Sequence, residues 1–302
     1  MVAISIDNLT KYYGNVEALN DLSLSIDDGE IFGFLGPNGA GKSTTIDIIL
    51  DFVRPTSGNV SVLGFDTQSE STKIRSRAGV LPEQFSPYDR LSGRQHVEFV
   101  AESKGISIDA DRYLSRVGLG EDGGRKAGGY SKGMKQRLGL AMSLVGEPEI
   151  LILDEPSTGL DPNGAREMRN IIKEENQRGT TIFFSSHILG QVEAVCDRVG
   201  ILRDGELVAE DSISGLRDAI GSDTQLSVTV DTVTDELTQT ISNLSGVSSV
   251  SVEDDSLTIR TEPEAKTTVL NAIEEEGVSV LDFSTEEASL EELFAAYTEG
   301  EQ

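Results

Sequence analysis

The chain has 302 residues, of which 37% are hydrophobic, 52 are acidic and 25 are basic, giving a net charge of -27. This length favours about two domains, and the apolar content is sufficient for a buried core, which argues against global disorder. The acidity also argues against binding nucleic acid through a broad basic surface.

Acidic side chains are spread over the whole chain and are densest near its end. Residues 222–302 contain 19 acids and two bases, Arg260 and Lys266, a net charge of -17. Such self-repulsion destabilises a compact state in dilute buffer and fades at about 1 M salt, where the screening length is about 3 Å. We therefore expect the cytoplasm of a halophile; the alternative is an ordinary cytoplasm with one solvated acidic tail.

The sequence contains no pattern typical of export or membrane insertion. Residues 1–14 alternate like a strand and do not resemble a signal peptide. No window approaches 18 uncharged apolar residues, so no membrane-spanning helix is predicted. The single cysteine, Cys196, excludes an intrachain disulfide and is expected to pack in the core. We expect a soluble, cytoplasmic chain.

Short apolar strands alternate with helical patterns through about Leu216, which predicts a mostly parallel α/β sheet. The expected elements, in chain order, are strands 1–14 and 31–36, helix 43–53, strand 59–64, a mostly helical stretch 87–146, strand 149–155, helix 164–179, strand 180–187, helix 189–198 and the hairpin 199–210, which has an Asp-Gly turn.

The pattern changes near residue 220, where we place a domain boundary between 1–220 and 221–302. The second part predicts the order β-α-β-β-α-β, which is the order of a small α+β ferredoxin-like domain. Its expected elements are strand 225–231, helix 234–246, the hairpin of 247–253 and 256–262, helix 263–277 and strand 278–284. A last helix is expected at 289–300.

A glycine-rich loop between the strand at 31–36 and the helix at 43–53 matches the phosphate-binding pattern G-x-x-x-x-G-K-[ST]. Glycines allow backbone N–H groups to turn toward phosphate oxygens, the lysine adds positive charge, and the serine hydroxyl can hold Mg²⁺. The helix that follows directs its N-terminus at the same anion. The predicted phosphate-binding residues are Gly36, Pro37, Asn38, Gly39, Ala40, Gly41, Lys42, Ser43 and Thr44.

Two carboxylates and a histidine follow strands that should end at the same edge of the sheet. Asp154 ends a buried strand and is expected on the Mg²⁺ side of the phosphate site. Glu155 follows directly and can orient and deprotonate an attacking water. His187 ends another buried strand and is expected to hydrogen-bond the γ-phosphate. The other histidine, His96, is interpreted as structural.

Together these motifs resemble the nucleotide-binding domain of ATP-binding cassette (ABC) transporters, over about residues 1 to 216. Residues 36–43 look like Walker A, 151–155 like Walker B with its catalytic glutamate, 157–161 like the D-loop and His187 like the switch histidine. The resemblance implies a P-loop NTPase cassette with a helical subdomain at about 87–146, ATP and Mg²⁺ as cofactors, and ATP hydrolysis.

The stretch 130–134, Tyr-Ser-Lys-Gly-Met, looks like the ABC signature, usually Leu-Ser-Gly-Gly-Gln. In the family this motif opens a helix that faces the γ-phosphate of an ATP held by another subunit. The resemblance therefore implies that Ser131 and Gly133 bind ATP in a sandwich of two chains, formed with a second copy or a paralogue. Lys132 and Met134 depart from the usual residues, but Ser131 and Gly133 are the chemically demanding positions.

Two further sites follow from the resemblance. The family's Q-loop glutamine contacts Mg²⁺ and water; here Glu83 occupies the usual position and Gln84 follows it, so either can serve. We slightly favour Gln84, as a catalytic and metal residue, because a carboxylate would add charge beside the phosphates. Tyr13 matches the position that stacks on adenine, with Val16 and Ala18 supporting the ring, although Tyr12 is an alternative.

The resemblance is to the ATPase subunits of export-type transporters, which implies a chain bound peripherally to the inner face of the membrane beside separate permease subunits. The alternative is a soluble ABC-type ATPase that serves iron-sulfur assembly or translation. A degenerate cassette that does not hydrolyse ATP is disfavoured because Lys42, Asp154, Glu155 and His187 are intact. The C-terminal domain carries no recognisable chemistry, and we interpret it as a dimerisation or solubility module.

Overall fold

The computed structural model describes residues 1–219, 224–253, 255–262 and 265–286. Contacts divide the chain into two compact units, Met1–Ser212 and Ile213–Gln302. Within the described ranges, no helix is both long enough and apolar enough to cross a membrane.

The first unit is organised around a six-stranded sheet with the order β10-β9-β3-β8-β7-β6. Five neighbouring strands pair in parallel, as predicted, and β10 (Glu206–Ser212) pairs antiparallel with β9 through the Asp204–Gly205 turn. All residues of β3, β7 and β8 are buried, which explains the apolar runs 31–35, 150–153 and 182–184. The parallel strands are β3 (Ile31–Leu35), β6 (Ala78–Leu81), β7 (Ile150–Asp154), β8 (Thr181–Ser186) and β9 (Arg198–Arg203).

A second, antiparallel sheet has the order β2-β1-β4-β5. Its members are β1 (Val2–Tyr13), β2 (Val16–Asp27), β4 (Ser57–Val62) and β5 (Phe65–Asp66). The sequence analysis predicted β1 and β4, but it identified neither β2 nor β5. Buried Leu22, Leu24 and Ile26 alternate with exposed neighbours, so the sequence did carry a strand signal for β2, which only the three-residue step from Leu19 to Leu22 interrupts.

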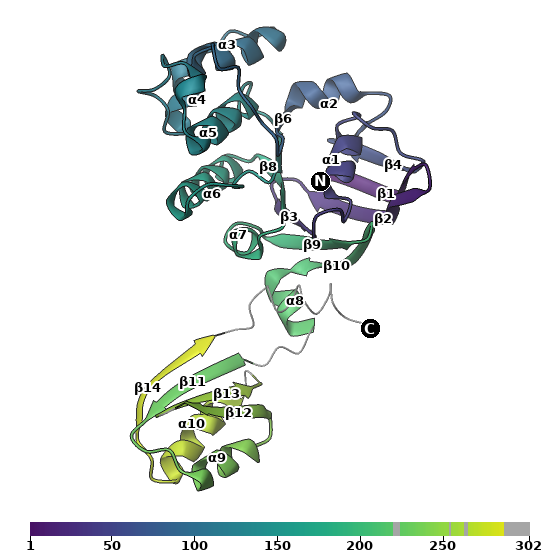
Figure 1. Ribbon diagram of the computed structural model, residues 1–302. Coiled ribbons are helices and arrows are strands. Elements are labelled where there is room, and N and C mark those ends of the chain that lie inside the picture. The colour runs from purple at the N-terminus through teal and green to yellow at the C-terminus, as the bar shows by residue number, and fades with distance from the viewer. Residues whose placement is uncertain (220–223, 254, 263–264, 287–302) are drawn as a thin grey trace. The chain divides into compact units, whose positions relative to one another are not determined.

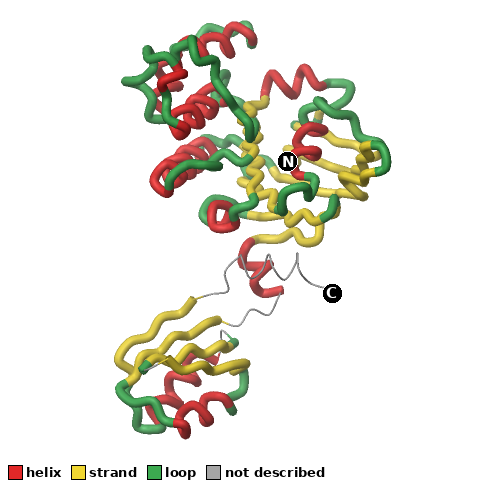
Figure 2. The backbone as a smooth tube through the Cα atoms, viewed as in Figure 1, coloured by secondary structure: helices red, strands yellow, loops and turns green. Residues whose placement is uncertain are grey.

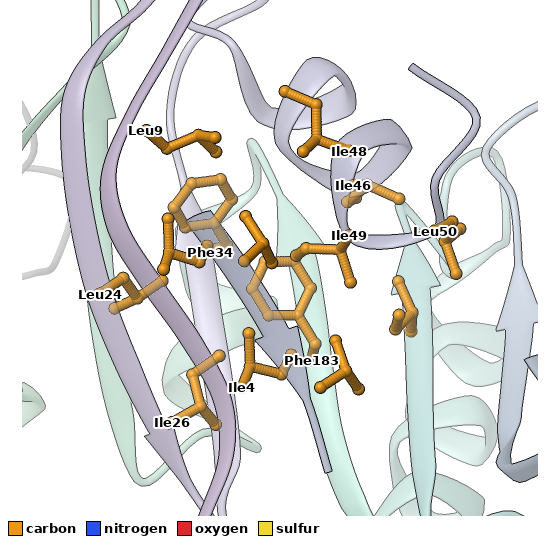
Figure 3. Close-up of a cluster of buried hydrophobic side chains, with 14 of the residues drawn as sticks. Ile4, Leu9, Leu24, Ile26, Phe34, Ile46, Ile48, Ile49, Leu50 and Phe183 are labelled. Carbon is orange, nitrogen blue, oxygen red and sulfur yellow. The ribbon is translucent and has the colours of Figure 1, made fainter. Parts of the chain in front are cut away.

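The main core of the first unit lies between the antiparallel sheet and one face of the large sheet. Figure 3 shows Phe34 and Phe183 from the large sheet among aliphatic side chains of β1, β2 and α1 (Lys42–Ile49). Their ring centroids are 5.3 Å apart. On the opposite face of the large sheet lie α6 (Pro162–Gln177) and α7 (Leu189–Glu193) (Figure 1). This core holds the first turn of α1 against the ends of the parallel strands.

Two helices are shorter than the sequence predicted. α1 ends at Ile49 instead of residue 53, because Leu50 caps it and Asp51 adopts a left-handed conformation with φ 56°. α7 ends at Glu193 instead of residue 198, because the backbone N–H of Asp197 donates to the Ile31 carbonyl and this segment already belongs to the sheet.

A mostly helical segment interrupts the sheet between β6 and β7, as predicted for residues 87–146. It contains α3 (Gly93–Ser103), α4 (Ala110–Arg116), the short 3-10 helix η1 (Ala127–Gly129) and α5 (Lys132–Ser143), which Figure 1 shows grouped together; α2 (Ser71–Arg77) precedes β6. Ser92 and Gln95 form a capping box at the start of α3. His96 is buried on α3, and its Nε2 accepts the backbone N–H of Tyr88 at 2.9 Å, consistent with a structural role.

The second unit has a four-stranded antiparallel sheet with the order β12-β13-β11-β14. Helices α9 and α10 cover one face of this sheet (Figure 2). The chain order and the strand order are those of a ferredoxin-like fold, which confirms the prediction. The helix expected at 289–300 lies outside the described residues. The elements are α8 (Ile213–Ala219), β11 (Thr224–Val230), α9 (Asp235–Ser242), β12 (Val247–Glu253), β13 (Ser256–Thr261), α10 (Lys266–Glu275) and β14 (Val280–Glu286).

Candidate functional site

The parallel strands of the large sheet bring distant parts of the sequence to one edge. Leu35 at the end of β3 pairs with Ser186 at the end of β8, and Asp154 at the end of β7 pairs with Ser185. Leu81 at the end of β6 pairs with Leu153. Because the carboxyl ends of parallel strands share an edge, the loops that follow these strands meet there.

A pocket of about 300 Å³ opens at this edge. It contains most of the predicted phosphate loop together with both predicted carboxylates. The lining residues are Ala18, Asn38, Gly39, Gly41, Lys42, Ser43, Thr44, Glu83, Asp154 and Glu155. Of the other predicted loop residues, Gly36 and Pro37 accept hydrogen bonds from Lys42, and the backbone N–H of Ala40 donates to the Pro37 carbonyl at 3.2 Å.

The loop holds the Lys42 ammonium inside its curve. Its Nζ donates to the carbonyl oxygens of Gly36 at 2.6 Å and Pro37 at 3.2 Å. Burial lowers the pKa of Lys42, while the negative charges of Glu155, Asp154 and Glu83 oppose that shift. Gly41 has φ 110°, and a Cβ there would lie 2.7 Å from the Ala18 carbonyl oxygen, so the turn requires glycine.

Asp154 is buried at the end of β7 and is held by a residue that the sequence analysis did not identify. The Ser185 hydroxyl donates to Asp154 Oδ1 at 2.5 Å. Burial raises the pKa of Asp154, the Ser185 hydrogen bond lowers it, and the charges of Glu83 and Glu155 raise it further. A signal was present in the sequence, since Ser185 is one of two serines that follow the apolar residues 182–184 and directly precede His187.

Glu155 has a left-handed backbone conformation with φ 50°, which a residue with a Cβ seldom adopts. The carboxylate is buried, and its Oε1 lies 2.7 Å from His187 Nδ1. An ionised carboxylate only accepts hydrogen bonds, so Nδ1 carries the proton of this contact. The Thr158 hydroxyl donates to the other oxygen, Oε2, at 3.3 Å. The structure therefore joins the predicted general base directly to the predicted histidine.

Tyr13 and Gln84, like His187, do not line the pocket. The Tyr13 side chain lies at the end of β1, is 47% exposed, and has Lys11 Nζ 4.8 Å from its ring centroid. Gln84 is exposed and follows Glu83, which does line the pocket. The geometry thus favours Glu83 over Gln84, contrary to the preference based on charge.

Ser131 and Gly133 also lie outside the pocket, at the start of α5. Ser131 is the N-cap residue, and its hydroxyl accepts the backbone N–H of Met134 at 3.2 Å. The Lys132 side chain covers Gly159, and Leu160 approaches Gly133. The motif at 130–134 therefore packs against the loop that follows Glu155 in the same chain, although it does not contact that chain's own pocket.

The pocket offers oxygen ligands that suit a hard divalent cation. The Ser43 hydroxyl and the Asp154 carboxylate both line it. In the part of the chain that the structure describes, no group of three His, Cys, Asp or Glu residues is placed to hold a metal ion. The Ser43 hydroxyl and the Asp154 carboxylate together fit Mg²⁺, which in proteins is commonly bound by one or two carboxylates together with substrate phosphates and water.

Comparisons with known proteins match both units. A family model described as "ABC transporter" matches residues 19–158, and one described as "ATP-binding protein DrrA1-3-like, C-terminal domain" matches residues 212–298. The linearmycin resistance ATP-binding protein LnrL of Bacillus subtilis is 32% identical over 98% of each chain. The daunorubicin resistance ATP-binding protein DrrA3 of Streptomyces coeruleorubidus is 33% identical over 98% of this chain and 96% of its own.

Solved structures resemble the first unit. The dimeric structure of MJ0796, a bacterial ABC transporter cassette, is 28% identical and covers 70% of this chain and 98% of its own, with a TM-score of 0.65. This similarity confirms the expected cassette fold.

Proposed function

Because this chain belongs to the ATP-binding subunits of ABC transporters, we propose that it powers the export of a small molecule through separate transmembrane subunits. It is an ATPase whose hydrolysis is coupled to transport. The observation that carries the proposal is the pocket at this sheet edge, which gathers Lys42 from one segment and the adjacent Asp154 and Glu155 from another. Relatives named for transport and resistance support this function over a soluble ATPase that is not coupled to transport.

The phosphate loop binds the triphosphate of ATP. Backbone N–H groups of residues 38–44 and the start of α1 surround the phosphate oxygens, and the Lys42 ammonium exchanges its contacts with loop carbonyls for contacts with the β- and γ-phosphates. Ser43 and Asp154 would hold Mg²⁺, which when bound would supply positive charge that neutralises the phosphates. Tyr13 stacks on the adenine, supported by its position at the end of β1 and its exposed ring.

Glu155 acts as the general base. Its carboxylate accepts a proton from the attacking water, while His187 and Thr158 fix its orientation. With Nδ1 donating to Glu155, the other ring nitrogen of His187 donates to a phosphate oxygen when the ring is protonated. Ser185 holds Asp154 and also accepts the backbone N–H of Glu155 at 3.2 Å, so one hydroxyl positions both carboxylates.

The complete catalytic unit is a dimer, formed with a second copy or a paralogue. Ser131 and Gly133 lie on the N-terminus of α5, where unpaired helix N–H groups favour an anion, yet they do not line the pocket of their own chain. Their ligand is the γ-phosphate bound by the other subunit. The dimeric cassette that this chain resembles supports this arrangement.

The exported molecule is a toxic small compound, a class suggested by the names of the linearmycin and daunorubicin resistance relatives.

The chain works in the cytoplasm, bound peripherally to the inner face of the membrane. The first unit, Met1–Ser212, is the ATP-binding domain, and the second, Ile213–Gln302, is an accessory domain that stabilises the dimer. The net charge of -27 suits a cytoplasm of high ionic strength.

Affinity purification tests the proposed function. A tagged full-length chain is isolated from solubilised membranes in molar KCl, and its partners are identified by mass spectrometry. We expect a protein with several membrane spans at a stoichiometric ratio, and the same tag on an unrelated soluble chain serves as the control. Recovery of soluble partners alone, or absence of the tagged chain from the membrane fraction, would contradict a role in transport.

A further inference from the structure

The loop after β6 places a third carboxylate in the nucleotide pocket. Leu81 is buried at the end of the strand, and the backbone N–H of Phe85 donates to the Pro82 carbonyl at 3.2 Å, which closes a turn with Glu83 at its second position. Phe85 packs against α5, where a Cβ on Gly139 would lie 2.8 Å from its ring. The turn is therefore anchored on both sides, and Glu83 lines the pocket.

This carboxylate changes the charge of the pocket. The ionisable lining residues are Lys42, Glu83, Asp154 and Glu155, so one positive charge faces three negative ones when all are ionised. Glu83 interacts electrostatically with both Lys42 and Asp154. A free nucleoside triphosphate carries several negative charges of its own and is repelled by this surplus. A divalent cation removes that repulsion and gains an oxygen-rich environment.

We propose that Glu83 makes this pocket selective for the divalent cation–nucleotide complex over the free nucleotide. The inference rests on the proposed function of the same site. The carboxylate lowers the affinity for metal-free ATP by charge repulsion and raises the affinity for the complex by attracting its cation. Lys42, Ser43 and Asp154 supply the main binding interactions. Glu83 determines whether the metal-bound or the metal-free nucleotide occupies the pocket.

The test is the affinity of the full-length chain for a fluorescent ATP analogue, measured with excess Mg²⁺ and again with excess EDTA. The Glu83→Gln variant keeps the size of the side chain and removes its charge. We expect it to bind the metal-free analogue about tenfold more tightly, since one nearby repulsive charge is lost, while its affinity for the Mg²⁺ complex stays equal or falls. Higher KCl should shrink the difference between the variants, because salt screens an exposed carboxylate.

Gln84 provides matched controls at the adjacent position. Gln84→Ala should keep the wild-type ratio of the two affinities, and the double variant Glu83→Gln, Gln84→Glu should behave like Glu83→Gln, because its carboxylate lies outside the pocket. An unchanged ratio in Glu83→Gln, or a wild-type ratio in the double variant, would overturn the role of Glu83. A wild-type chain that binds the analogue under neither condition would instead overturn the proposed function, and this inference with it.

Discussion

Both units of the chain combine helices with β-sheets, yet the nucleotide pocket belongs to the first. In the large sheet, five neighbouring strands run in parallel, so the loops after β3, β6, β7 and β8 meet at one edge. In the second unit every strand pair is antiparallel, so the carboxyl ends of neighbouring strands lie at opposite edges. Strand direction therefore explains why the first unit can assemble a catalytic site from distant segments.

The two units also differ in charge. Residues 222–302 have a net charge of -17, whereas the remaining 221 residues carry -10. The core of the second unit consists mainly of Leu, Ile and Val side chains, and that of the first also contains aromatic rings such as Phe34 and Phe183. We therefore expect substitutions in the first unit to have the largest effects on ATP hydrolysis. We expect salt concentration to have its largest effect on the stability of the second unit.

The largest expected effect is that of Glu155→Gln. Loss of the general base should reduce ATP hydrolysis by about 10³-fold, while the phosphate loop still binds ATP. An ATP-bound dimer should then accumulate in high salt, as measured by phosphate release and sedimentation with MgATP. Lys42→Ala serves as the comparison and should bind ATP poorly. Sedimentation of Glu155→Gln as monomer alone would contradict the two-chain site.

Ser185→Ala should have the next largest effect. Removing its hydroxyl releases Asp154 and one contact of the Glu155 backbone, so we expect hydrolysis to fall by about 10- to 100-fold. The matched control is Ser186→Ala on the same strand, because the Ser186 hydroxyl contacts the backbone of Ile188 instead of a carboxylate. Steady-state phosphate release measures both variants, and equal losses in both would show that Ser185 has no special role.

Asp154→Asn should separate stability from activity. Burial raises the pKa of Asp154, so protonation favours the folded state, and this contribution is lost as the pH rises through the folded pKa. At neutral pH the variant should therefore have a higher free energy of unfolding than the wild type, although its ATPase activity is lost. Urea unfolding without nucleotide at several pH values measures this. The difference should narrow as the pH falls, and a less stable variant at neutral pH would contradict the argument.

The smallest expected effect concerns salt. Hydrogen exchange of the full-length chain, compared in dilute buffer and about 1 M KCl, should show a larger gain in protection for β11 and β13 than for β3 and β8. The reason is the charge surplus of the second unit, which salt screens. Equal gains in both sheets would show that the acidity of residues 222–302 does not limit the stability of their fold.

Particular residues show how far the sequence could predict this molecule. Local sequence patterns were enough to identify the phosphate loop, because it is a short motif, and Asp154, Glu155 and His187, because they directly follow or end apolar strands. The ferredoxin-like order of the second unit could be predicted because its helices and strands have clear hydrophobic periodicity. β2 was missed although Leu22, Leu24 and Ile26 alternate with exposed polar residues, so its signal was present in the sequence. α1 and α7 were predicted to be longer than they are, because the apolar sequence continues into residues that belong to turns and to the sheet.

The sequence by itself determined the phosphate-binding loop, the order of the catalytic motifs and the division into two folds, since each of these depends on residues close together in the chain. The tertiary structure decided which side chains meet. It placed Ser185 against Asp154, joined His187 to Glu155, and directed Glu83 instead of Gln84 to the pocket. The reason is that these contacts depend on the register between strands and on the anchoring of a turn, which local sequence patterns do not specify.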